Sequence, residues 1–143
     1  MKKFEFSLQR LYEVKEMEEQ QKQAQLRDLE RNLENYKRQK EANRKLYDRE
    51  HAVYDKKCRT GMTMFEVQRY GDYFQYLEKE MRQQERIIQS VQANIDECRS
   101  GLLKIINEKG VLDRKREDQY EEYKKEVAKE EDKSIEDFMQ SRM

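Results

Sequence analysis

The residues that could do chemistry in this chain are few and stand apart from one another. His51 is the only histidine, and the sequence offers no base or nucleophile partner for it. Adjacent carboxylates occur at Glu121 and Glu122 and at Glu130 and Glu131, but an acid/base pair needs a cavity that desolvates it, and a helix surface provides none. The sequence contains no nucleotide-binding glycine loop, catalytic triad or metal-ligand cluster. We therefore expect a protein that is not an enzyme and uses no metal or cofactor, with His51 as a plain surface residue.

The composition narrows the class of protein. Of the 143 residues, 43% are charged and 35% are hydrophobic, with four glycines and no proline or tryptophan. This is too little apolar material for a globular core, but it suits long helices because Glu, Lys, Gln and Arg favour the helix. The 31 basic and 31 acidic residues cancel, which gives little reason to bind nucleic acid or an anionic membrane.

The expected compartment is the cytoplasm. Cys58 and Cys98 show neither zinc-ligand nor redox spacing, which is typical of a reducing environment. No apolar run approaches the roughly 18 residues of a membrane span, and residues 1–6 lack the apolar core of a signal peptide. We expect no direct membrane insertion, so that any membrane association comes through a partner.

A regular apolar pattern organises the second half of the chain. Steps of three and four residues from Val67 reach an apolar side chain at twelve of fourteen positions. A repeat of 3.5 residues over six heptads indicates a narrow hydrophobic seam and hence a left-handed coiled coil. It also argues against disorder, the alternative for so polar a chain. The positions of this second seam are Val67, Tyr70, Phe74, Leu77, Met81, Gln84, Ile88, Val91, Ile95, Cys98, Leu102, Ile105, Lys109 and Leu112.

A first segment, at about residues 4–58, follows the same step with eight apolar positions of fourteen. Residues 59–63 separate the two segments: Gly61 can adopt the left-handed conformation that ends a helix, and Thr63 with Glu66 has the form of a capping box. A short loop between two long helices makes them antiparallel neighbours. The positions of the first seam are Leu8, Tyr12, Lys15, Glu19, Lys22, Leu26, Leu29, Leu33, Tyr36, Lys40, Asn43, Tyr47, Glu50 and Tyr54.

We therefore predict an all-α fold, an antiparallel two-helix coiled-coil hairpin that forms one domain over residues 1–143. Helix 1 is expected at about 4–58, the loop at about 59–63, and a longer helix 2 at about 64–139. Seam partners whose numbers sum to 124 match in kind, with Leu33 opposite Val91 and Lys15 opposite Lys109, and such polar layers fix the register. Residues 117–143 form an acidic overhang, with ten acidic and four basic residues in 117–137, a net charge of −6. We expect a monomeric hairpin.

A further apolar pattern lies on one flank of the seam, near the loop. Leu46, Val53, Tyr73 and Ile87 occupy flanking positions that face each other across an antiparallel pair, and we call them the outer strip. They could broaden the seam and need no partner, or they could form a surface on which another protein docks. We favour docking, since Tyr76 adds aromatic area nearby and aromatic residues are favoured interface anchors.

Three groups of residues, in order and over nearly the whole length, resemble the FliJ family, the small coiled-coil component of the bacterial flagellar type III export apparatus. The residues that carry the resemblance are Phe4, Glu5, Phe6, Ser7, Leu8, Gln9, Arg10 and Leu11, then Gly61, Met62, Glu66, Tyr70, Tyr73, Phe74 and Leu77, and finally Asp132, Ser134, Ile135, Phe138 and Met139.

The resemblance implies a non-enzymatic adaptor on the inner face of the cell membrane, held there by the export apparatus. It implies insertion as a stalk into the ring of the export ATPase (FliI), promoting its assembly and activity. It further implies binding to the cytoplasmic domain of the export gate (FlhA), and contacts with export chaperones. Together with the outer strip, it gives as expected gate-docking residues Leu46, Val53, Tyr73, Leu77, Gln84 and Ile87. The paired termini would face the ATPase, with Leu8, Leu11, Tyr120 and Tyr123 as expected contacts.

Two other functions are compatible with the same sequence. The protein could be an ATPase regulator that threads a ring and never touches a gate. It could instead be a cytoplasmic coiled-coil spacer or filament that self-associates along the outer strip, without any ATPase or export role.

Overall fold

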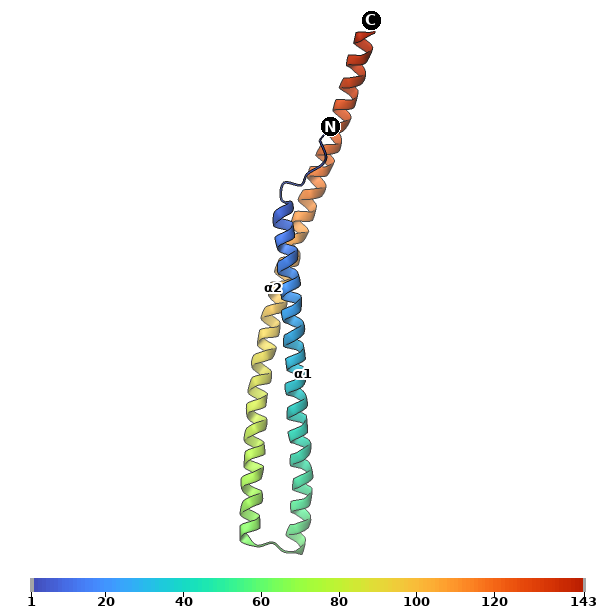
Figure 1. The fold of residues 1–143 in the computed structure, drawn as a ribbon. Coiled ribbons are helices and arrows are strands. Elements are labelled where there is room, and N and C mark those ends of the chain that lie inside the picture. Colours follow the sequence, from blue (N-terminus) through green and yellow to red (C-terminus); the bar gives the residue numbers. More distant parts are fainter. Residues whose placement is uncertain (1, 143) are drawn as a thin grey trace. The chain divides into compact units, whose positions relative to one another are not determined.

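The computed structural model describes residues 2–142 and consists of two helices joined by a short loop (Figure 1). Helix α1 spans Gln9–Thr60 with 52 residues, and helix α2 spans Met64–Ser141 with 78 residues. The helices pack side by side in opposite directions, and α2 is the longer, so the predicted all-α antiparallel hairpin is confirmed. Met1 and Met143, the end residues of the predicted domain and of the acidic overhang, lie outside the described residues.

The chain turns where local residue types favour a turn. Gly61 has a φ of 109°, and its N–H donates to the Lys57 carbonyl at 2.9 Å, which closes the last turn of α1. Thr63 accepts a hydrogen bond on Oγ1 from the Glu66 backbone N–H at 3.2 Å and thereby caps α2. Both helices end two residues later than expected, a difference that is ordinary at helix ends.

The start of α1 differs from the prediction, because it begins at Gln9 instead of about residue 4. Residues 2–6 adopt neither helix nor strand and are followed by a turn, in which the Phe6 carbonyl accepts a hydrogen bond from the Gln9 N–H at 3.1 Å. On a helix, two residues that lie two positions apart point in different directions. Outside the helix, Phe6 is only 8% exposed while Phe4 is half-buried.

Every position of both seams is buried or half-buried, as the heptad pattern predicts. The chain divides into two compact units, unit 1 with Met1–Gln23 and Ser100–Met143, and unit 2 with Ala24–Arg99. Buried apolar side chains form a small core in each unit: Phe6, Ile105 and Leu112 in unit 1, and Leu77, Ile95 and Cys98 in unit 2. Cys58 is exposed, and both cysteines are thiols rather than halves of a disulfide.

In the polar layer of unit 1, two lysines each form an ion pair with a glutamate. Lys15 and Lys109 were predicted to face each other, and each finds a carboxylate instead. Lys15 Nζ lies 2.6 Å from Glu108 Oε2, and Lys109 Nζ lies 2.7 Å from Glu19 Oε2. The hydrogen bond from Lys15 holds the pKa of the Glu108 carboxyl below its ordinary value, and the hydrogen bond to Glu19 raises the pKa of Lys109. The seam therefore admits two lysines without like-charge repulsion.

In unit 2, the polar layer contains an amide pair and an ion pair. Asn43 Nδ2 donates to Gln84 Oε1 at 3.2 Å, and Lys40 forms a close ion pair with Glu85. The hydrogen bond from Lys40 lowers the pKa of the Glu85 carboxyl. A strict sum of 124 predicts Lys40 as the partner of Gln84. The observed partner is Asn43, the next position along the first seam.

Candidate docking surfaces

The outer strip in unit 2 is accessible to a partner only in part. Leu46, Tyr73 and Ile87 are half-buried, and Val53 is 39% exposed. Part of each side chain is buried and part is open to solvent. The buried part is compatible with a broadened seam, and the open part is compatible with a docking surface. None of the four belongs to the buried core, and the prediction that they face one another on one flank stays a prediction.

Two of the expected gate-docking residues belong to the seam and are not part of the open surface. Leu77 is 2% exposed, since it packs in the core of unit 2. The Gln84 side chain is half-buried and already accepts the hydrogen bond from Asn43. A partner that docks on this side of unit 2 would reach the outer strip first and would touch Leu77 only if the helices separated.

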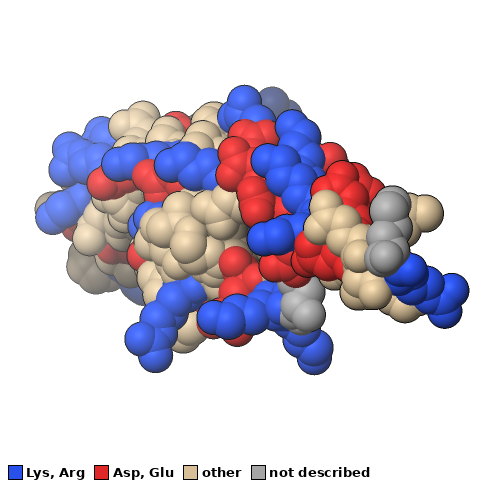
Figure 2. Space-filling view, turned by 90° about the horizontal axis from the view of Figure 1, so that it is seen from above, with Lys and Arg blue, Asp and Glu red and all other residues tan. Residues whose placement is uncertain are grey.

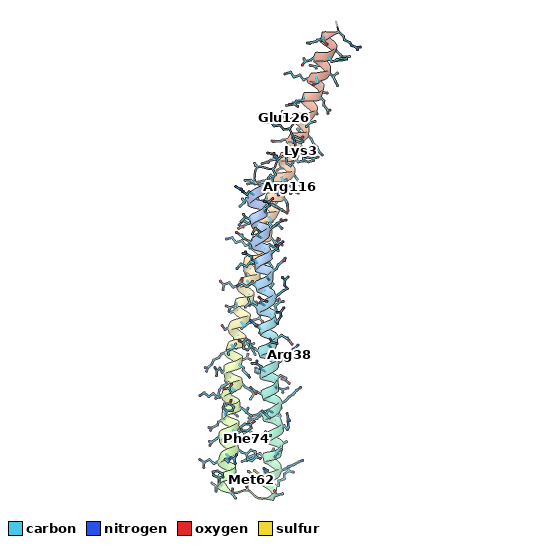
Figure 3. All side chains as sticks on the ribbon, viewed as in Figure 1. Lys3, Arg38, Met62, Phe74, Arg116 and Glu126 are labelled. Atoms are coloured by element: carbon cyan, nitrogen blue, oxygen red, sulfur yellow. The ribbon has the colours of Figure 1, made fainter. Side chains whose placement is uncertain are left out.

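An aromatic cluster supports the strip from below. Phe74 reaches between α1 and α2 (Figure 3), with its ring centroid 5.2 Å from Tyr47 and 5.7 Å from Tyr54. Tyr70 lies 5.3 Å from Tyr54, as the register predicts, and Tyr73 lies 6.4 Å from Phe74. Tyr73, the ring that the strip presents, thus lies beside a cluster of packed aromatic rings.

His51 belongs to this cluster and is not the plain surface residue that we expected. Its ring lies 5.1 Å from Phe74 and 5.7 Å from Tyr47, and its Nδ1 lies 3.4 Å from Asp55 Oδ2. The sequence signal for these contacts is the spacing of four residues on each side of His51, which places Tyr47 and Asp55 on one helix face.

The surface next to Tyr73 is grooved and carries mixed charge. A cavity of about 430 Å³ is lined by Glu50, Lys57, Glu66, Arg69, Tyr70 and Tyr73. Within it, Lys57 Nζ donates to the Tyr70 hydroxyl at 2.9 Å. The outer face of α2 continues with Phe65, 69% exposed and below the Arg69 guanidinium at 5.9 Å, and with Tyr76, 57% exposed. Sequence analysis missed Phe65, although its spacing of eleven residues from Tyr76 places the two rings on one face.

The expected ATPase contacts all lie in unit 1. Leu11 is 44% exposed and Tyr120 is 43% exposed, while Leu8 and Tyr123 are half-buried. Phe4, which was not expected to take part, lies 5.1 Å from the Tyr120 ring and 5.5 Å from the Tyr123 ring. The structure therefore brings the two tyrosines together under the N-terminal segment.

The overhang is shorter than predicted, because residues 2–7 pack along α2 as far as Tyr123. The Tyr123 hydroxyl donates to the Lys2 carbonyl at 2.8 Å, and Gln119 Nε2 donates to Ser7 Oγ at 3.0 Å. From residue 124 onward every described side chain is exposed except Val127, which is half-buried. The carboxylates that could have formed acid/base pairs, Glu121, Glu122, Glu130 and Glu131, are all exposed.

The charges on the surface are mixed. Figure 2 shows basic and acidic side chains interspersed over the face it presents, with uncharged atoms between them. Across residues 2–142, no group of three or more His, Cys, Asp or Glu side chains is placed to hold a metal ion. Neither helix, as far as it is described, contains a stretch long and apolar enough to cross a bilayer. No protein-family model, curated protein or solved structure matches the chain.

Proposed function

We propose that this protein is a non-enzymatic adaptor of the flagellar type III export apparatus, which binds one partner through each of its two units. Unit 2 docks on the cytoplasmic domain of the export gate through the outer strip. Unit 1 enters the ring of the export ATPase and promotes its assembly and activity. The protein so links the ring to the gate at the inner face of the membrane. The proposal rests on the resemblance to the FliJ family.

The observation that carries the unit 2 assignment is the exposed aromatic area on α2. Tyr73 stands on the Phe74 cluster, and Phe65 and Tyr76 continue the surface around α2. Aromatic and arginine side chains are enriched among residues that dominate binding energy. The alternative of a broadened seam does not explain why Phe65 and Tyr76 remain more than half exposed.

Two features support the unit 1 assignment. Beyond Tyr123, α2 continues to Ser141 with no α1 residues beside it, so its surface is available to a partner. In this overhanging part of α2 almost every described side chain is exposed. Its excess of acidic residues favours a partner surface with basic residues.

Reciprocal double variants test the two assignments, because each unit has at least one leucine and one tyrosine among its expected contacts. Leu46→Ala with Tyr73→Ala should reduce affinity for the gate's cytoplasmic domain about 30-fold or more, as loss of a tyrosine hot spot does. Leu11→Ala with Tyr120→Ala should leave gate binding unchanged and weaken stimulation of the ATPase. Circular dichroism at 222 nm should show native helicity for both variants.

The opposite outcome would show that the two units are exchanged. Binding by the original chain to neither partner would exclude the adaptor and leave the spacer or filament. Sedimentation tests for self-association. A filament protein should form oligomers at micromolar concentration, and Leu46→Ala with Tyr73→Ala should dissociate these oligomers.

A further inference from the structure

We propose that residues 2–8 form a displaceable strap that covers the beginning of an apolar face of α2, and that the ATPase ring displaces this strap when it binds. The inference rests on the proposed function, because it concerns the regulation of the same unit 1 surface. The strap controls how much of the face a partner can reach.

The covered face continues along α2 beyond the strap. Tyr120, Val127 and Phe138 are separated by seven and eleven residues, close to two and three whole helical turns, so they lie on one side of the helix. Ile135 falls near the same line and is 57% exposed, and Phe138 is 58% exposed. The strap therefore covers the start of a face whose remaining part is open.

The strap is held by few contacts, and they are concentrated on four residues of its length. Phe6 is buried and Phe4 packs edge-on to Tyr120. The Ser7 backbone N–H and hydroxyl both lie within hydrogen-bond distance of Gln119 Oε1, Gln119 Nε2 donates to Ser7 Oγ, and the Tyr123 hydroxyl donates to the Lys2 carbonyl. Fixing a segment outside any helix removes backbone entropy at every residue, and that loss opposes the gain from two aromatic side chains. A partner that displaces the strap therefore has to replace the burial of Phe4 and Phe6 and these hydrogen bonds with contacts of its own.

The position of the strap makes it compete with a partner. In Figure 3, Lys3 lies along α2 between Arg116 and Glu126. Phe4 stands against both Tyr120 and Tyr123, so a partner surface that follows the face from Val127 to Tyr120 meets the Phe4 ring. A cavity of about 820 Å³ opens beside the strap and gives a partner side chain an entry; its lining is Phe4, Glu5, Phe6, Gln9, Arg116, Glu117 and Tyr120.

Charge identifies the chemistry of the competing surface. Lys2 and Lys3 lie at the start of the strap, over a part of α2 where residues 117–137 carry a net charge of −6. The strap offers α2 two kinds of contact, apolar side chains and positive charges. A ring surface with apolar side chains bordered by Lys or Arg would offer the same two kinds. A second copy of the acidic segment would not, because two segments of like charge repel each other.

A reversible lock tests the proposal on the full-length chain. Ser7→Cys with Gln119→Cys, in a Cys58→Ser background, places two thiols where the side chains are now hydrogen-bonded. A short bis-methanethiosulfonate reagent then joins them, and reductant releases them. Rapid intramolecular cross-linking, measured by mass spectrometry, is expected; failure to cross-link would overturn the docked strap without reference to any partner.

Binding to the export ATPase is then compared for the cross-linked and the released protein. We expect the locked form to bind about tenfold more weakly and reduction to restore binding, and Phe4→Ala with Phe6→Ala to bind at least as tightly as the unaltered chain. Equal affinity of locked and released protein would overturn the strap's role while sparing the proposed function. Absence of ATPase binding in both forms would overturn the proposed function and the displacement with it. The Ser7→Cys variant alone, treated identically, controls for the reagent.

Discussion

Ile95 offers the sharpest test of the helix pairing, because it is only 1% exposed and sits in the middle of the second seam. The change Ile95→Ala removes three carbon atoms from the core of unit 2. Truncating a buried isoleucine to alanine typically lowers the free energy of unfolding by about 2–5 kcal/mol. The lower half of this range applies where neighbouring side chains can move into the space that is left. A two-helix seam is open to solvent on both flanks and can close in this way, so we expect a loss of about 2–3 kcal/mol.

The matched control is Ile106→Ala, which makes the same chemical change in the same helix at a side chain that is 44% exposed. Alanine favours the helix more than isoleucine does, and this gain is common to both variants, so their difference isolates burial. Surface changes of this kind usually stay within about 0.5 kcal/mol. The difference between the two variants should therefore approach 2 kcal/mol.

Urea denaturation followed by ellipticity at 222 nm measures these free energies of unfolding, and thermal melting should place the midpoint of Ile95→Ala about 6–10 °C below that of the unaltered protein. Equal losses in both variants, or no loss at Ile95, would refute the pairing of the two seams. A midpoint that rises with protein concentration would show that the partner helix comes from a second chain.

Two further changes probe the loop and the polar layer. Gly61→Ala should destabilise the hairpin by about 1–2 kcal/mol, because alanine is strained at a positive φ. Gly71→Ala, in the interior of α2 with open space around it, should instead stabilise by about 0.5–1 kcal/mol. The urea midpoint should therefore fall for Gly61→Ala and rise for Gly71→Ala, and shifts in the same direction would contradict the loop geometry. For pH, the lowered pKa of Glu108 means that its pairing with Lys15 stabilises the fold above the ordinary value of 4.5 and is lost as pH falls through the folded value. The stability difference between the unaltered protein and Glu108→Gln should therefore be constant near neutral pH and shrink below 4.5, and a difference that persists into acid would show that the ion pair is not its cause.

The sequence was sufficient for the two helices, the turn and the paired seams. These depend on short-range rules: a 3.5-residue period fixes which side of a helix must be buried, and Gly61 and Thr63 act on their own backbone neighbours. Tyr54 and Tyr70 meet as the register predicts, with ring centroids 5.3 Å apart. The placement of the outer strip on one flank follows from the same period and stays a prediction.

The tertiary structure alone decided the features that depend on competition between alternative partners. Residues 4–8 could have continued α1, yet they lie outside it, where Phe4 packs against Tyr120 and Tyr123 and Phe6 is buried. Leu77 and Gln84 were expected both in the seam and on the docking surface, and the packed helices leave Leu77 only 2% exposed and pair Gln84 with Asn43.

The polar groups show the same division. Periodicity put Lys15 and Lys109 at one level of the seam, and it could not say where their charges would go. A long flexible side chain chooses among several carboxylates within reach, so Glu108 and Glu19 were selected by distances that only the packed helices define. A repeating pattern determines which residues face inward, whereas the partner of each inward or flanking side chain depends on the geometry of both helices together.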